Sequence, residues 1–310
     1  MGGQGDVAII GAGITGLTCA RALADAGLRV AVFDKGRGPG GRMSTRRTDG
    51  GLQFDHGAQL LPARDPDFAA WLADGGHAAP WPGQHGWVGR PAMAAIPRAM
   101  AQGLDLHQGA AVNRLIRRDG LWHLGGEGID HRAARVVLAI PAPQARDLLG
   151  GDDPLSADLA QVRFHASVTV MAALDPDAPR PFVTRRGQGP LAWIAQDGTK
   201  PGRAGQPLTT WVVQADPDWS MAHIDLPFDE LAAMIAPLLL AELGARPDQL
   251  RHAAAHRWLY AQAERPLGRA FLQDDARGLI VGGDWALGPL AEHGWASGRA
   301  MAAHLLARAS

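Results

Sequence analysis

Three glycines near the N-terminus stand in the spacing of a phosphate-binding loop. Gly11, Gly13 and Gly16 form a GxGxxG pattern directly after an apolar stretch. The first glycine permits a tight turn, the second lets the backbone approach a pyrophosphate, and the third lets a helix pack closely on a strand. Asp34 ends the next apolar stretch, where a carboxylate can accept hydrogen bonds from both hydroxyls of a ribose. These residue types in this order predict a dinucleotide-binding site.

The elements around the glycines fit a βαβ unit. Residues 6–10 predict a buried strand, residues 17–24 repeat apolar side chains at helical spacing, and residues 29–33 predict a second strand. Gly27 is placed to end the helix as a left-handed cap. The N-terminus of that helix, next to Ile14, would direct free N–H groups at the phosphates. The glycines therefore have the context that a nucleotide site requires, and we do not interpret them as ordinary turn residues.

Two segments far apart in the sequence extend this site. Gly41 and Arg42 follow the second strand, and their amides and guanidinium could bind a pyrophosphate. Near the C-terminus, Gly283 and Asp284 follow a predicted strand at residues 278–281. A carboxylate at such a strand end could bind a hydroxyl of a ribityl chain.

A final helix, predicted over residues 295–306, would begin just beyond this turn. Its positive end, at Trp295 and Ala296, could stabilise negative charge that develops on a reduced flavin ring.

The remaining sequence predicts an α/β protein with a second, mainly antiparallel sheet. Four segments between residues 150 and 265 alternate apolar and polar side chains, around one amphipathic helix. These strands are expected at residues 162–174, 191–196, 208–215 and 252–260, and the helix at residues 228–243. Elsewhere we expect a helix over residues 91–101 that Pro97 limits, a hairpin with arms 111–118 and 121–124, and a buried strand over residues 135–140 that Pro141 ends.

This pattern predicts a discontinuous nucleotide domain with an inserted substrate domain. The nucleotide domain would comprise residues 1–63, 90–150 and 266–310. The substrate domain would comprise residues 64–89 and 151–265.

Composition restricts the classes of partner. A formal net charge of −1 over 310 residues gives no reason to expect nucleic acid or an anionic membrane as partner. Cys19 is the only cysteine, which excludes an intramolecular disulfide and a thiolate metal cluster. The histidines have no metal-ligand spacing, so we expect no metal site. We also expect a cytoplasmic protein, because no targeting segment or membrane span is evident. The oligomeric state is not predicted.

Several motifs together resemble those of bacterial renalases, members of the amine-oxidase-like flavoprotein superfamily with a p-hydroxybenzoate-hydroxylase-type architecture. They are GAGITGL, FDKGRGPGGRMSTRR, FDHGAQ, WVGRPAMAAIPRAM, LAIPAPQA, HRWLYA and GGDW, in the expected order over nearly the whole chain. The resemblance implies non-covalently bound FAD. The residues that would contact FAD are Gly11, Gly13, Ile14, Gly16, Asp34, Lys35, Gly41, Arg42, Pro141, Gly283, Asp284, Trp295 and Ala296. His56, Gly57, Ala58 and Gln59 would lie along the isoalloxazine ring, and Val112 would offer its backbone to adenine.

The resemblance also implies a reaction. Renalases are associated with oxidising isomers of NAD(P)H that carry their hydride at C2 or C6. The hydride passes to flavin N5, O2 is reduced to H2O2, and β-NAD(P)+ is released. The expected partners are therefore a dihydronicotinamide nucleotide and O2.

Three residues on one predicted strand are candidates for the reacting site. His256 matches a histidine of the renalase pattern and could face the flavin, and Trp258 and Tyr260 share its face at period two. The same spacing is also typical of side chains in an ordinary sheet core. Both interpretations stay open.

Two other functions also stay open. Another flavin oxidoreductase on this scaffold could oxidise an amine or a polyene, although amine oxidases of this superfamily commonly use a lysine near flavin N5. Lys35 and Lys200 are the only lysines, and Lys35 is assigned to the nucleotide loop. A non-catalytic FAD- or nucleotide-binding protein is the third possibility.

Overall fold

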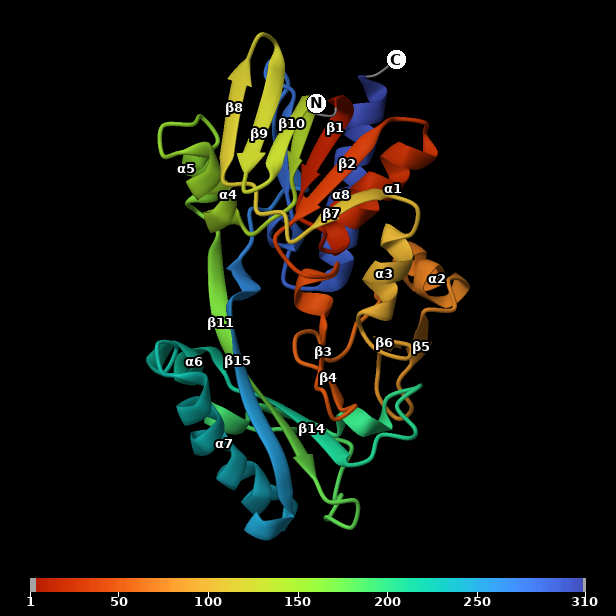
Figure 1. Ribbon diagram of the computed structural model, residues 1–310, viewed down its shortest axis with the longest axis vertical. Coiled ribbons are helices and arrows are strands. Elements are labelled where there is room, and N and C mark those ends of the chain that lie inside the picture. Colours follow the sequence, from red (N-terminus) through yellow and green to blue (C-terminus); the bar gives the residue numbers. More distant parts are fainter. Residues whose placement is uncertain (1–3, 309–310) are drawn as a thin grey trace.

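An eight-stranded sheet forms the upper part of the molecule in Figure 1, and the computed structural model describes residues 4–308. Its main strands lie in the order β16-β17-β10-β1-β2-β7, and the β8–β9 hairpin extends from β10. The strands are β1 (Gln4–Ile10), β2 (Val30–Asp34), β7 (Asp105–Gln108), β8 (Arg114–Arg118), β9 (Leu121–Gly126), β10 (Ile129–Leu138), β16 (Phe271–Asp274) and β17 (Leu279–Gly282).

The carboxyl ends of the parallel strands position the predicted nucleotide residues. Strands β1, β2, β7, β10 and β17 are parallel to one another, so their carboxyl ends share one edge. Gly11 follows β1, Asp34 ends β2, and Gly283 follows β17. Ligands of open α/β sheets bind at this edge.

Helices cover both faces of the large sheet. Helices α1 (Ile14–Asp25) and α8 (Ala291–Ala307) pack against each other on one face, next to α3 (Ala95–Ala101). Their contact is close because Gly294 and Gly298 of α8 lie against α1: a Cβ at Gly298 would stand 2.8 Å from the Thr18 side chain. On the other face, α4 (Ala142–Leu149) and α5 (Ser156–Leu159) bury Ala142, Ala145 and Leu159 in a second core.

The lower sheet has five antiparallel strands. Their order is β12 (Thr184–Arg186), β13 (Trp193–Ala195), β14 (Thr209–Gln214), β11 (Arg163–Leu174) and β15 (Leu250–Arg265). Helices α6 (Pro217–Ala222) and α7 (Phe228–Leu243) cover one face. The other face meets a hairpin of β3 (Thr45–Arg47) and β4 (Gln53–Asp55), where Phe54 packs with Met171 and Val212. Strands β11 and β15 pair with each other and extend from the lower sheet toward the upper one (Figure 1).

Short elements complete the chain. They are α2 (Pro66–Asp74), β5 (Ala78–Pro80), β6 (Trp87–Gly89) and five 3-10 turns at Gly41–Met43, Gly189–Leu191, Asp197–Thr199, Pro247–Gln249 and Asp284–Ala286. Among the described residues, no helix is both long and apolar enough to cross a bilayer.

The α/β architecture predicted from the sequence is confirmed, and several element boundaries are corrected. The strand predicted over residues 135–140 is β10, which begins at Ile129 because it pairs with β9 before it joins β1. The helix predicted over residues 91–101 begins at Ala95, so Pro97 lies in its first turn, where a missing N–H costs little. The hairpin arm predicted from residue 111 begins at Arg114. The division into two domains stays a prediction.

Candidate active site

The N-terminus of α1 is open to a ligand. Gly13 is its N-cap and no side chain caps the helix. A Cβ at Gly13 would meet no atom within 4 Å, whereas a Cβ at Gly16 would collide with the carbonyl oxygen of Gly11. Gly11 itself has a φ of 107°, which favours glycine. The open backbone at Gly13 and the uncapped N–H groups beside it fit a pyrophosphate, and we call this feature the nucleotide cradle.

Asp34 lies beside this helix end. Its carboxylate accepts the N–H of Ala12 at 2.6 Å and the N–H of Gly36 at 2.6 Å. Carboxylate oxygens can accept more than one hydrogen bond, so Asp34 can still accept one from a ribose hydroxyl.

Lys35 and Val112 were also predicted to contact FAD. The Lys35 side chain is exposed, and the Val112 side chain is partly buried against the core that α4 and α5 cover.

Arg42 and Asp284, predicted separately, are partners. The Arg42 guanidinium donates to both Asp284 oxygens, at 2.6 and 2.9 Å, and to the carbonyl oxygen of Ala261 at 3.0 Å. The backbone of Arg42 also accepts the N–H of Ala58 at 2.8 Å. This bidentate pair joins the glycine-rich loop after β2 to the turn after β17. The structure therefore brings together two predicted cofactor segments that lie far apart in the sequence.

The start of the last helix differs from the prediction. Helix α8 begins at Ala291, so Trp295 and Ala296 lie in its second turn and the free N–H groups belong to the turn before them. The early start has a local cause, because the His293 imidazole accepts the N–H of Leu290 at 3.1 Å. The Trp295 ring is buried, with its centroid 5.5 Å from that of Phe68. Its side chain belongs to the core.

Side chains of the lower sheet fix the segment predicted to lie along the flavin. The Trp258 indole donates to the carbonyl oxygen of His56 at 2.8 Å, and the Gln214 amide donates to that of Gly57 at 2.7 Å. A Cβ at Gly57 would collide with the carbonyl oxygen of Arg42. Residues 56–59 are thus held between the two sheets, and Gln59 is buried at their end.

Three rings form a cluster at this junction. The centroids of His56, His256 and Trp258 lie 4.5 to 5.2 Å apart. Burial, then the neighbouring His256, lowers the pKa of His56 to about 4. Burial, then the charges of Arg46 and Arg257, lowers the pKa of His256. Both imidazoles are therefore neutral at neutral pH.

Tyr260 does not join this cluster. Its ring makes an edge contact with Phe164, at 5.4 Å between centroids. The pairing of β11 with β15 shifts its register between His165 and Ser167, so side chains of β15 do not alternate regularly between the two faces past Trp258.

Pro141, also predicted to contact the cofactor, is the N-cap of α4.

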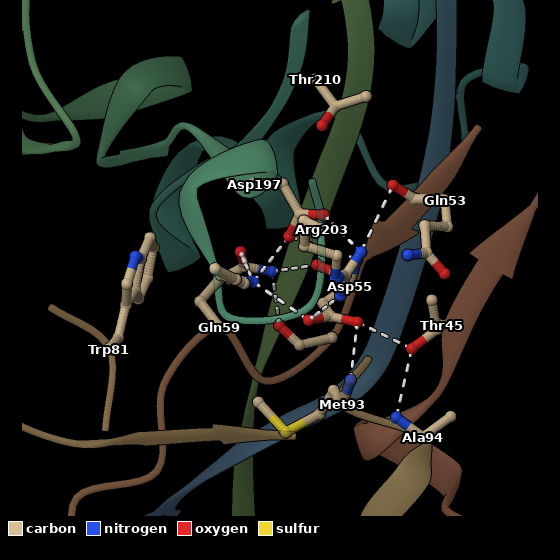
Figure 2. Close-up of polar contacts among 12 residues, drawn as sticks. Thr45, Gln53, Asp55, Gln59, Trp81, Met93, Ala94, Asp197, Arg203 and Thr210 are labelled. Atoms are coloured by element: carbon tan, nitrogen blue, oxygen red, sulfur yellow. Dashed lines mark hydrogen bonds and ion pairs between the residues drawn. The ribbon is translucent and has the colours of Figure 1, made fainter. Parts of the chain in front are cut away.

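A buried group of four charged side chains, Asp55, Asp197, Lys200 and Arg203, contacts the end of the segment 56–59. Figure 2 labels Asp55, Asp197 and Arg203 of this group, together with Gln59. Lys200 contacts Asp197 at 2.6 Å and Asp55 at 3.2 Å, and Arg203 contacts Asp55 at 2.5 Å and Asp197 at 2.9 Å. The exposed fraction of all four side chains is 0%. Lys200 also donates to Gln59 at 3.2 Å, which ties this ionic quartet to the end of residues 56–59.

The two carboxylates of the quartet differ in pKa. Burial raises the pKa of Asp55, but the charges of Lys200 and Arg203 outweigh it, and its pKa lies below the usual value. Burial and the neighbouring Asp55 keep the pKa of Asp197 above the usual value despite Lys200. Two cations balance two anions, as buried charges require.

The sequence pointed only weakly to the quartet. The loop residues of the quartet, Asp197, Lys200 and Arg203, are spaced three apart in a stretch rich in glycine and proline. Such spacing occurs in many solvent-exposed loops, so it does not indicate burial or pairing. Asp55 is the second residue of the FDHGAQ segment, directly before His56, and nothing in its sequence position indicates that it would meet the loop of Asp197. Within residues 4–308, no three His, Cys, Asp or Glu side chains come together as metal ligands would.

Comparisons with known proteins agree with this geometry. Residues 9–74 match the NAD(P)-binding Rossmann-like domain, and residues 71–306 match the flavin containing amine oxidoreductases. A stretch of 59 residues is 42% identical to a 4,4'-diapophytoene desaturase (4,4'-diaponeurosporene-forming) of Staphylococcus haemolyticus. That stretch covers 19% of this chain and only 12% of the desaturase.

Two solved structures have similar folds over almost their full length. An Exiguobacterium protein described as a protoporphyrinogen oxidase has a TM-score of 0.72 at 15% identity, over 96% of this chain and 98% of its own. A putrescine oxidase bound to putrescine has a TM-score of 0.71 at 16% identity, over 99% and 100%. At these identities the likeness concerns the fold. The family match over residues 71–306 shows that the chain belongs to the flavin containing amine oxidoreductases and is an FAD-dependent oxidoreductase.

Proposed function

We propose that this FAD-dependent oxidoreductase is an oxidase of isomeric (2- or 6-) dihydro-NAD(P), which releases β-NAD(P)+ and H2O2. The observation that carries the proposal is the neutral ring cluster that His256 and Trp258 form with His56, the first residue of the segment 56–59. When bound, FAD would supply the hydride acceptor at flavin N5 and the site where O2 is reduced. The cradle at Gly13 and the carboxylate of Asp34 would hold its pyrophosphate and ribose.

A dihydropyridine needs little acid–base help, because formation of the aromatic nicotinamide ring drives loss of the hydride. The protein must instead orient a flat ring and keep water away from it. His256 and Trp258 can pack on such a ring, and the hydrogen bond from the Trp258 indole to the His56 carbonyl oxygen fixes Trp258 against residues 56–59. Neutral imidazoles suit this role, since they place no charge beside a donor that becomes cationic.

Oxidation of an amine is the second candidate, and the family match supports it equally. The lysines of this chain weigh against it. The Lys200 ammonium is fully buried and contacts Asp55, Asp197 and Gln59, and Lys35 is exposed beside the nucleotide loop. Neither is free to take the place near flavin N5 that a lysine commonly holds in amine oxidases.

Aerobic turnover of the FAD-loaded protein tests the proposal. We expect 6-dihydro-NAD or 2-dihydro-NAD to give equal amounts of H2O2 and β-NAD+, and putrescine to give none. H2O2 release from putrescine alone would establish the amine oxidase instead. FAD-loaded protein that turns over neither substrate class would support the non-catalytic interpretation, and purified protein without bound flavin would contradict the cofactor.

A further inference from the structure

A second hollow opens beside α3, apart from the nucleotide cradle. It has a volume of about 580 Å3, and its walls come from α3, β7, the end of β3 and the loops at residues 37–39 and 90–92. Figure 1 shows α3 between β7 and the β5–β6 hairpin. None of Gly11, Gly13, Asp34 or Arg42 lines it. The hollow is large enough for a small organic ligand, since such pockets span about 300–1,000 Å3.

Four arginines converge on this hollow. Arg37, Arg47, Arg90 and Arg98 line it together with His77, and no aspartate or glutamate of the described residues does. None of the four makes an ion pair within residues 4–308. Many other arginines of the same structure do, and the chain as a whole carries a net charge of −1. The unbalanced positive charge is therefore local to the hollow.

Two of these arginines, Arg47 and Arg98, lie close enough for their charges to interact. Partial burial lowers the pKa of Arg47, and the charges of Arg98 and Arg203 lower it further. In β3, Arg47 follows Thr45 on one face, and Thr45 donates to Asp55 and accepts from Ala94. Arg46 alternates to the opposite face, toward His256. The hairpin thus separates the hollow from the ring cluster.

We propose that this hollow binds a phosphorylated small molecule of about mononucleotide size, at a site distinct from that of FAD. Arginine is suited to phosphate because its planar fork can donate two parallel hydrogen bonds to two phosphate oxygens. The remaining wall gives a ligand both polar and apolar contacts: Gln102 and Gln108 can donate or accept hydrogen bonds, while Ala95 and Leu106 can pack on a flat base. The anion would also relieve the repulsion between Arg47 and Arg98.

Calorimetric titration of the FAD-loaded protein with AMP tests the proposal. Visible flavin absorbance is followed throughout, so that displacement of FAD from the cradle is recognised. We expect saturable AMP binding without loss of flavin, and competition by inorganic phosphate. Arg98→Gln and Arg90→Gln should each weaken AMP binding roughly tenfold. Arg117→Gln, which changes an exposed arginine of β8, should leave it unchanged.

Three results would overturn the proposal. The first is an FAD-loaded protein that takes up no AMP. The second is an AMP affinity that is equal in the wild type, Arg98→Gln and Arg90→Gln. The third is binding of citrate as tight as that of AMP, which would show an unselective anion surface. Because all four arginines are exposed, the substitutions are expected to leave the fold intact, and the melting temperature of each variant checks this.

Discussion

His56 and His256 are the residues through which the ring cluster would act on a substrate. Both have lowered pKa values because the junction of the two sheets buries them, and two protonated rings so close together would repel. A neutral pair allows His256 to contact a flat donor without adding charge. We therefore expect the role of His256 to be separable from FAD binding, because the residues predicted to hold the pyrophosphate and ribose of FAD, Gly13 and Asp34, belong to the other sheet and its first helix.

Replacing His256 tests this separation. We expect His256→Ala to slow flavin reduction by about tenfold or more, because the donor ring loses its packing partner, with a smaller effect on the dissociation constant of FAD. Stopped-flow reduction and FAD titration measure the two quantities. His123→Ala in β9, far from the ring cluster in the sequence and fold, serves as the control. Equal losses in both quantities would show that His256 is structural.

Acid should destabilise the protein through His56. Its pKa is about 4 in the folded chain and about 6.5 when unfolded, so the unfolded state takes up the proton first as pH falls. Stability is therefore lost between about pH 6.5 and pH 4, by an amount on the order of 3 kcal/mol. Denaturant unfolding of the wild type and His56→Gln at about pH 7.5 and pH 4.5 measures this. The variant should lose less stability on acidification, and an equal loss would refute the assignment.

The ionic quartet should be costly to unbalance. Lys200→Met leaves two buried carboxylates with one cation, which should lower the free energy of unfolding by about 3–5 kcal/mol. Adding Asp197→Asn restores the charge balance and should recover part of the loss. Arg185→Gln breaks the exposed pair with Glu242 and should cost less than about 1 kcal/mol. Denaturant unfolding compares the variants, and a double variant no more stable than Lys200→Met would contradict this account.

At the level of residues, local spacing was informative and long-range pairing was not. The spacing of Gly11, Gly13 and Gly16 led to the cradle, because its chemistry lies within one βαβ unit. The ionic quartet depends on a loop of the lower sheet meeting β4, which no periodicity encodes. The alternation of side chains along a strand correctly predicted that Trp258 lies beside His256. It did not predict the position of Tyr260, because the register of the strand pairing shifts there.

Among the elements, the βαβ unit assigns different tasks to two of its glycines. Gly13→Ala adds a methyl group in open space, at a φ of −75° that alanine adopts freely. It should leave the stability of the apoprotein nearly unchanged and weaken FAD binding, because the methyl group would stand where the pyrophosphate approaches. Gly16→Ala should destabilise the apoprotein itself, by about 1–3 kcal/mol, because its Cβ would collide with the Gly11 carbonyl.

Thermal unfolding with and without FAD distinguishes the two variants. FAD should raise the melting temperature of the wild type, by mass action, but have little effect on that of Gly13→Ala. Gly16→Ala should unfold at a lower temperature even without FAD. A wild-type response to FAD in Gly13→Ala would contradict the position assigned to the pyrophosphate.

Element types were easier to predict than element ends. Runs of apolar residues correctly predicted the strands β1, β2 and β17. Amphipathic spacing correctly predicted the helix α7, with the observed bounds Phe228–Leu243. The ends depend on partners distant in the sequence. Strand β10 is longer than predicted because it pairs with β9 as well as β1, and α8 begins early because His293 satisfies the Leu290 N–H.

In the whole molecule, the candidate site lies where the two sheets meet. Strands β11 and β15 belong to the lower sheet but extend toward the upper one (Figure 1). Residues 56–59 are bound from both sides: the Trp258 indole of β15 donates a hydrogen bond to the His56 carbonyl oxygen, and the Arg42 carbonyl oxygen accepts the N–H of Ala58. The alternation of element types along the chain predicted this two-sheet arrangement. Its cofactor is established by the family match, whereas the substrate depends on the ring cluster and on the resemblance of the motifs.

Rapid anaerobic mixing of the FAD-loaded protein with 6-dihydro-NAD tests the proposed function most directly, because it observes hydride transfer without O2. The visible absorbance of the flavin should disappear in a single fast phase, and an equal concentration of putrescine should leave it intact. Persistence of the absorbance with both 2- and 6-dihydro-NAD, or bleaching by putrescine alone, would contradict the proposal that the ring cluster receives a dihydronicotinamide.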